Sequence, residues 1–266
     1  YGEAVLQGLA PDRGLYGPKK YPTLSTQELK DLSSKNFVEI VTHIRQIFIG
    51  DSIPFEQQKL HANQAFDLSV FKHTKDGNVT PVREIADNLY VQNLSLGPTA
   101  AFKDIAMQLL APDMDFLLSE KDQTLTILGA TSGDTGSAAE AAFKKMENVI
   151  MHMLSPQNGM ADFQSAQMGQ WSGGNIHNLS VDGNFDDCQD LVKALKQMPE
   201  FTDLGAVNSI NWGRIVAQVG YYFSGYFQVA DTIGEEVDFV VPSGNFGNIL
   251  AGFIAITPSS FTPVLS

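Results

Sequence analysis

The sequence predicts an α/β fold built mainly on parallel strands. From about residue 89 onward, short apolar segments alternate with longer segments of helical periodicity. Two of the junctions pass from an apolar strand through a glycine-rich turn into a helix. This alternation is typical of parallel sheets covered by helices, in which ligands bind at the carboxyl ends of the strands.

The N-terminal part is predicted to be helical. Apolar residues recur at helical spacing over Thr26–Gly50, and Ser25 or Thr26 can cap this helix. Ser52–Phe66 is expected to form a second helix. The pattern changes only after this region, so the N-terminal part is expected to be separate from the alternating part.

The polar, turn-rich segment Lys72–Pro81 is the predicted boundary, which gives an N-terminal domain over residues 1–80 and an α/β region over residues 81–266. The expected strands are Leu89–Leu94, Thr124–Ala130, Asn148–Ser155, Asn175–Val181 and Val237–Gly244. The expected helices are Ala101–Glu120 (bent at Pro112), Ala138–Met146, Phe185–Met198 and Gly213–Ala230, and a glycine-rich turn runs into a helix over Asn245–Ile256.

The bulk composition excludes several classes of function. The formal net charge of −13 argues against a nucleic-acid partner, because binding phosphates requires a basic surface. No apolar run approaches the ~20 residues of a membrane span, so no membrane partner is expected. The five histidines lie far apart, and no metal site is expected. The only cysteine, Cys188, excludes an intrachain disulfide and fits a reducing compartment such as the cytoplasm.

Two strand-turn-helix junctions, Gly129–Ala139 and Val241–Gly252, are candidate anion sites. Glycine lets backbone N–H groups approach a ligand, and helix N-termini attract anions. Neither turn matches the common nucleotide-binding motifs, and tight packing alone also explains a glycine-rich turn. Cys188 lies between carboxylates that raise the pKa of a thiol, which favours a structural role over a nucleophilic one.

Lys103 has two interpretations. A lysine at a helix start is usually solvated. Its neighbours, which include Ala101, Phe102 and Ile105, are however apolar. Desolvation in such a setting lowers the pKa of a lysine amine, which is the state that a Schiff-base lysine needs. The residues alone leave both interpretations open.

Three segments together resemble one family. "GPTAAFKD" (Gly97–Asp104), "ATSGDTGSAA" (Ala130–Ala139) and "PSGNFGN" (Pro242–Asn248) are similar to three signatures of threonine synthases, in the same order. These enzymes form part of the tryptophan-synthase-β-like group of pyridoxal-phosphate (PLP) enzymes. The resemblance extends over nearly all of Tyr1–Ala255. It implies two mainly parallel α/β domains with a helical N-terminal segment, and a C-terminal part that this sequence lacks.

The resemblance also implies roles for individual residues. Lys103 matches the lysine that carries PLP as a Schiff base. The loop that binds the PLP phosphate in the family corresponds to Gly244, Asn245, Phe246, Gly247 and Asn248. The residues that match substrate-binding positions are Thr131, Ser132, Asp134, Thr135, Asn208 and Asn211.

The implied reaction converts O-phosphohomoserine and water to L-threonine and phosphate, by γ-elimination and then β-addition of water. PLP serves as the electron sink, and Lys103 is expected to carry the protons. A small-molecule substrate and a monomer or homodimer are expected.

Two departures from the family pattern keep alternatives open. Leu96 stands where the family has histidine, and "PQNGM" (Pro156–Met160) lacks a basic residue found in relatives. They suggest a PLP-dependent phospho-lyase that releases a keto acid. Thr257–Ser266 does not continue the family pattern, which suggests a catalytically silent paralogue as a third possibility.

Overall fold

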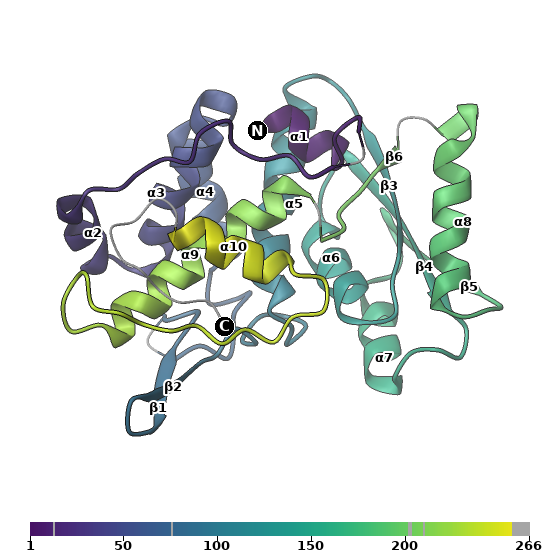
Figure 1. Cartoon of the computed structure of the whole chain (residues 1–266). Helices are drawn as coiled ribbons and strands as arrows, with labels where there is room; N and C mark the ends of the chain where they lie inside the picture. Colours follow the sequence, from purple (N-terminus) through teal and green to yellow (C-terminus); the bar gives the residue numbers. More distant parts are fainter. Residues whose placement is uncertain (13, 76, 202–203, 210, 257–266) are drawn as a thin grey trace.

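A four-stranded parallel sheet forms the frame of the α/β part (Figure 1). The computed structural model describes residues 1–12, 14–75, 77–201, 204–209 and 211–256. The strands lie in the order β5-β4-β3-β6 and comprise β3 (Leu125–Ala130), β4 (Val149–Pro156), β5 (Ile176–Val181) and the short β6 (Leu204–Gly205). The α/β class with a parallel sheet is therefore confirmed.

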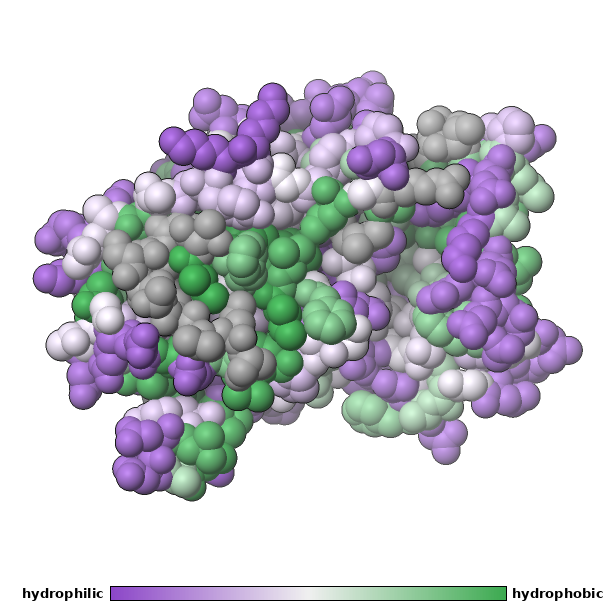
Figure 2. Space-filling view, in the orientation of Figure 1, coloured by the Kyte–Doolittle hydropathy of each residue, from purple (hydrophilic) through white to green (hydrophobic). Residues whose placement is uncertain are grey.

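The sheet is covered by helices on both faces. On one face α8 (Phe185–Gln197) packs against β3 and β4, where its buried Cys188 meets Leu128 and Leu154. Hydrophilic side chains cover the outer face of α8 (Figure 2). On the other face α6 (Asp134–Phe143) packs against β4.

Helix α5 (Lys103–Ser119), which contains Pro112, packs against α6, and α7 (Asp162–Trp171) lies on the outer side of α6. The expected helix Ala138–Met146 begins earlier than predicted, at Asp134. Helix α7 was not predicted. Met168 is its only buried residue, so its sequence has no clear apolar face.

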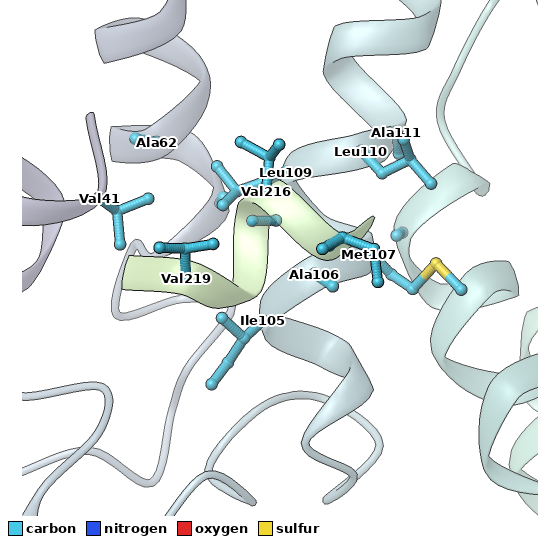
Figure 3. Close-up of a cluster of buried hydrophobic side chains, with 14 of the residues drawn as sticks. Val41, Ala62, Ile105, Ala106, Met107, Leu109, Leu110, Ala111, Val216 and Val219 are labelled. Atoms are coloured by element: carbon cyan, nitrogen blue, oxygen red, sulfur yellow. The ribbon is translucent and has the colours of Figure 1, made fainter. Parts of the chain in front are cut away.

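Helix α9 (Trp212–Val229) is the centre of the remaining part of the molecule. It contacts α3, α5 and α10 (Gly247–Ile256), and nearly all of its residues are buried. Figure 3 shows Val216 and Val219 of α9 among apolar side chains of the surrounding helices. A Cβ at Gly220 would lie 2.6 Å from Val41, so the absence of a side chain there permits a close crossing of α3 and α9.

The predicted single helix over Thr26–Gly50 is wrong, because the structure has two helices there. These are α2 (Thr26–Ser33) and α3 (Phe37–Ile49). Ser25 caps α2, and the Asn36 side chain accepts a hydrogen bond from the backbone N–H of Glu39 at 3.0 Å and caps α3. Asn36, the N-cap residue of α3, has an extended backbone, so the helical backbone is interrupted between α2 and α3.

The other N-terminal elements are α1 (Gly2–Gln7), a single 3₁₀ turn over Gly50–Ser52 and α4 (Phe55–Ala65), and a second 3₁₀ turn occurs later at Pro199–Phe201. The predicted helix over Ser52–Phe66 is thus confirmed as α4, with a later start. Pro54 precedes it and fixes the backbone just before the first turn.

The predicted strand Leu89–Leu94 exists as β2 (Leu89–Gln92), but it is not in the parallel sheet. It pairs antiparallel with β1 (Val82–Ala86), which was not predicted, and the hairpin projects from the body of the molecule (Figure 1).

The predicted strand over Val237–Gly244 is not found among the strands of the described sheets. Phe239 forms a single β-bridge within this segment, and Val240 is 80% exposed. An apolar segment becomes a strand only when a neighbouring strand accepts its backbone hydrogen bonds. Among the described residues, no helix is long and apolar enough to cross a membrane. The C-terminal segment Thr257–Ser266 lies outside the described residues.

Candidate cofactor and active site

Lys103 is the first residue of α5, and its side chain is 20% exposed. Its Nζ lies 3.4 Å from Oδ2 of Asp134, the first residue of α6. Two helix starts thus bring a lysine and a carboxylate together from positions 31 residues apart.

The surroundings of Lys103 lower the pKa of its amine. Burial has the largest effect, because it penalises the charged form. The negative charge of Asp134 opposes this shift, while the positive charge of Arg214 adds to it. The pKa of Lys103 therefore lies below the ordinary value for lysine, and the amine becomes available as a base at lower pH.

The loop before Lys103 is held by the next residue, Asp104. Its buried carboxylate accepts hydrogen bonds from the backbone N–H of Thr99 at 2.9 Å and from the Thr99 hydroxyl at 2.7 Å. A Cβ at Gly97 would lie 2.5 Å from Asp104, so only glycine fits there. Ala100 has φ +56°, which adds a strained residue that these contacts hold in place. These contacts fix the conformation of the turn that precedes Lys103.

The turn before α6 is organised by Thr131. Its Oγ1 accepts hydrogen bonds from the backbone N–H groups of Gly133 at 3.1 Å and Gly136 at 3.0 Å. Ser132 is exposed at the tip of this turn, and Thr135 is half-buried in the first turn of α6. The hydroxyl of Thr131 is thus used within the turn, whereas Ser132 faces solvent.

The glycine-rich loop before α10 is also closed by local hydrogen bonds. Ser243 Oγ donates to Oδ1 of Asn248 and accepts the backbone N–H of Phe246 at 3.0 Å. The backbone carbonyl of Asn248 accepts a hydrogen bond from the Tyr222 hydroxyl at 2.6 Å. Apart from its two chain neighbours, no atom of the described residues lies within 4 Å of the position that a Cβ would take at Gly244, so the backbone there has room for a ligand.

The start of α9 connects the lysine with this loop. Arg214 acts electrostatically on Lys103, and the next residue, Ile215, lies 3.6 Å from the Cβ position of Gly247. The Arg214 side chain is 3% exposed and donates to the carbonyl of Val207 at 2.9 Å. Burial lowers its pKa to about 10. Among the described residues, no partner accepts from its Nε.

An open, mainly apolar cavity of about 500 Å³ adjoins the loop. It is lined by Asn245, Phe246 and Gly247, by Ser209 and Ile215, and by Leu15, Ile249, Leu250 and Phe253. Phe246 and Phe253 are more than half exposed, and Figure 2 shows apolar side chains gathered over α10. Lys103 and Asp134 do not line this cavity, so the cavity lies beside the glycine-rich loop and does not enclose the lysine amine.

Comparison with known proteins places these features in a family. A family model described as "Pyridoxal-phosphate dependent enzyme" matches residues 74–260, and one described as "Threonine synthase N terminus" matches residues 1–66. The chain belongs to the pyridoxal-phosphate dependent enzyme family. PLP is accordingly the cofactor of the family to which Lys103 and the two turns belong.

The chain resembles threonine synthases within this PLP-dependent family. It is 45% identical to a threonine synthase of Methylobacillus glycogenes and 44% identical to one of Corynebacterium glutamicum, each over 96% of this chain and 55% and 54% of the relatives. The solved PLP-bound threonine synthase of Brucella melitensis matches with a TM-score of 0.90 at 39% identity, over 100% of this chain and 57% of that one. The chain spans about half the length of the curated relatives it matches.

The residues present fit PLP, as expected for this family. Lys103 has an amine of lowered pKa, which is the kind of group that PLP requires as a covalent anchor. The open backbone at Gly244 and the N-terminus of α10 supply donors and a positive helix end for a phosphate.

The structure brings some of the predicted site residues together and separates others. Lys103 and Asp134 are in contact, and Gly244–Asn248 form the loop at the start of α10. Asn208 is hydrogen-bonded, and its carbonyl accepts from the backbone N–H of Asn211. The fully buried side chain of Asn211 bonds the carbonyls of Val5 and Ala206 and the N–H of Gly213. Asn211 therefore stabilises the packing of α1 and α9, and the structure does not support the predicted contact with substrate.

Two residues near Lys103 were missed by the sequence analysis. One is Arg214, the only charged residue in α9, and a single charge in a largely apolar helix is a signal in the sequence. The other is Gln164, whose Nε2 donates a hydrogen bond to Asp134 Oδ1 at 2.8 Å. Nothing in the local sequence around Gln164 distinguishes it from an exposed glutamine.

Proposed function

We propose that the protein is a threonine synthase, which converts O-phosphohomoserine and water to threonine and phosphate. The observation that carries the proposal is the amine of Lys103, desolvated and placed beside Asp134 at the start of α6. The names of the most similar relatives and the order of the three motifs support the choice of reaction within the PLP-dependent family.

In this proposal Lys103 carries protons. PLP, when bound, supplies a ring that withdraws electrons and stabilises negative charge on a substrate carbon. A base that must both take and return protons works best when its pKa lies near the working pH. The lowered pKa of Lys103 moves its Nζ in that direction.

We propose that the turn before α6 and the loop before α10 each bind a different anion. We assign the phosphate of PLP to the loop of Gly244, Asn245, Phe246, Gly247 and Asn248, at the start of α10. Ser132 and Thr135, at the start of α6, are the proposed binding groups for the carboxylate of the substrate. Both assignments rest on the affinity of helix N-termini for anions.

The proposal includes a cytoplasmic enzyme with a small-molecule substrate, acting as a monomer or homodimer. Cys188 is buried, and burial raises the pKa of its thiol, which suits a structural cysteine in a reducing compartment. The net charge of −13 supports the absence of a nucleic-acid partner.

The test measures phosphate and threonine together after the PLP-loaded protein is mixed with O-phosphohomoserine. We expect equal amounts of both products. The change Lys103→Ala is expected to abolish the visible absorbance of bound PLP and to lower the rate by about 10³-fold or more. Absence of phosphate release by wild-type protein that binds PLP would contradict the proposal and favour a catalytically silent paralogue.

The same experiment addresses the phospho-lyase alternative. Leu96 packs against the hydrophobic core, and Gln157–Met160 places no basic side chain near the end of β4. Relatives have a basic residue in this segment. If that residue is needed for the addition of water at the β-carbon, the protein will release phosphate and a keto acid without threonine. Ketobutyrate in place of threonine would establish this alternative.

A further inference from the structure

Helix α7 contacts both segments that carry the site. Gln164 Nε2 donates to Oδ1 of Asp134 at 2.8 Å, and Gln167 Nε2 donates to the carbonyl of Thr99 at 2.9 Å. Residues three apart lie on the same face of a helix. One face of α7 therefore bridges the turn before α6 and the loop before Lys103.

These two hydrogen bonds join α7 to the site, whereas buried Met168 and a hydrogen bond from Asn178 Nδ2 to the Met168 carbonyl at 3.1 Å join the helix to the core. Met168 is its only buried residue, and Phe163 is 67% exposed. Because α7 has no continuous apolar face, its polar contacts contribute to its orientation. The two glutamines thus connect α7 to the site.

Gln164 fixes a carboxylate that would otherwise be free to turn. The side chain of Asp134 is 47% exposed, and its two oxygens are divided between Gln164 and Lys103. The contact with Lys103 is 3.4 Å long, at the limit of a hydrogen bond, and does not by itself hold the carboxylate. The 2.8 Å bond from Gln164 is the stronger restraint.

The turn leaves room for this amide. A Cβ at Gly133 would lie 2.4 Å from Gln164 Nε2, so a larger residue there would displace the amide. Gly133 is buried beneath it. The glycine of the turn and the glutamine of α7 are therefore complementary in shape.

We propose that Gln164 is a positioning residue for Lys103. It orients the Asp134 carboxylate so that the second oxygen faces the lysine amine and sets how readily that amine is protonated. The role given to Lys103 rests on the proposed function, but the contacts that position it do not. Arg214, the other charged group that acts on Lys103, is on α9 and is not part of this device.

The test is the pH dependence of acylation of the Lys103 amine in the full chain before PLP is added. A water-soluble acylating reagent is used at a series of pH values, and modified peptides are quantified by mass spectrometry, with the exposed Lys59 as internal reference. In Gln164→Ala the carboxylate of Asp134 is expected to turn toward solvent, so the negative charge next to the Lys103 amine is weakened. We expect the midpoint for Lys103 to fall by about 0.5 pH unit.

A second background gives the result its meaning. In an Asp134→Asn background, Gln164→Ala is expected to cause no additional shift, because Gln164 acts through the charge of Asp134. A general structural effect of Gln164→Ala on the surroundings of Lys103 would instead shift the midpoint in both backgrounds.

The matched control is Gln170→Ala, an exposed glutamine on the same helix, which is expected to leave the midpoint unchanged. An unchanged midpoint in Gln164→Ala, or an equal shift in the Asp134→Asn background, would overturn the inference. The readout does not require threonine synthesis. If the protein fails to release phosphate from O-phosphohomoserine, the proposed function fails and the titration still decides the role of Gln164.

Discussion

At the scale of single residues, the chemistry of Lys103 depends on three opposing influences. Burial and Arg214 both lower the pKa of the amine, and Asp134 raises it. The two charged groups come from α6 and α9, which both pack against α5. Because Asp134 is negative and Arg214 is positive, removing one charge or the other is expected to shift the pKa of the amine in opposite directions.

We predict opposite pH shifts for Asp134→Asn and Arg214→Met. PLP reacts with the neutral amine, so its rate of binding rises as Lys103 loses its proton. Without the negative charge of Asp134, the pKa falls and the rate rises at lower pH. Without the positive charge of Arg214, the pKa rises and the profile moves to higher pH. Stopped-flow absorbance across a pH series measures both, and shifts of the same sign would contradict the prediction.

Some of these residues could be found from the sequence and others could not. Lys103, Asp134 and the glycine-rich loop stand in three motifs whose order carries information. Gln164 and Arg214 are single residues whose significance depends on what lies opposite them in space. Asn211 is the opposite case. The sequence singles it out as a substrate-binding candidate, but its side chain is hydrogen-bonded to backbone groups of the protein.

At the scale of elements, α6 carries a buried carboxylate that the proposed reaction does not use. Glu140 is fully buried between α6 and β5, where its Oε2 accepts from Asn178 Nδ2 at 3.3 Å. Burial raises the pKa of Glu140 from 4.5 to about 7. The folded protein therefore holds a proton there that the unfolded chain releases at lower pH.

We predict that Glu140→Gln removes part of the pH dependence of stability. A raised pKa in the folded state gives stability that is complete below about pH 4.5 and is lost as the pH rises through about 7. At pH 8 the variant is expected to be more stable by about 1–3 kcal/mol, and at about pH 4, below the ordinary pKa of glutamate, the difference is expected to disappear. Urea unfolding at both pH values measures this, with exposed Glu147→Gln as control. An equal effect at both pH values would contradict it.

The elements themselves were predicted where their signals are local. Strands β3, β4 and β5 and helices α5, α8 and α9 follow from apolar periodicity over their own residues. Helix α7 was missed because its helical pattern has no apolar face. The expected strand over Val237–Gly244 is reduced to a single β-bridge at Phe239 among the described residues, because the extent of a strand depends on a partner that the segment's own sequence does not specify.

At the scale of the whole molecule, one buried carboxylate joins the N-terminal helices to α5. Asp113 accepts hydrogen bonds from the Tyr1 hydroxyl at 2.6 Å and from Arg45 of α3, and its Oδ1 lies 2.8 Å from Nδ1 of His61 on α4. Burial raises the pKa of Asp113, but Arg45 and His61 outweigh it and hold the pKa below its ordinary value. The helix that begins with Lys103 is thereby anchored to the N-terminal part.

We predict that Asp113→Asn is strongly destabilising. It leaves the guanidinium of Arg45, which is 1% exposed, without its counter-charge in the interior. Breaking a buried ion pair on one side costs about 3–5 kcal/mol. Urea unfolding is the measurement, and Asp51→Asn, at an exposed aspartate, is the control. A loss below about 1 kcal/mol, which is typical of exposed ion pairs, would contradict the prediction.

The sequence alone determined the α/β class, the positions of the local elements and the three motifs, because periodicity, caps and glycine turns act within a few residues of each other. Only the tertiary structure decided which groups surround Lys103. Asp134, Arg214 and Gln164 come from α6, α9 and α7, and they act on one amine through distance, burial and shared hydrogen bonds. These quantities depend on how the helices pack, which no single segment encodes.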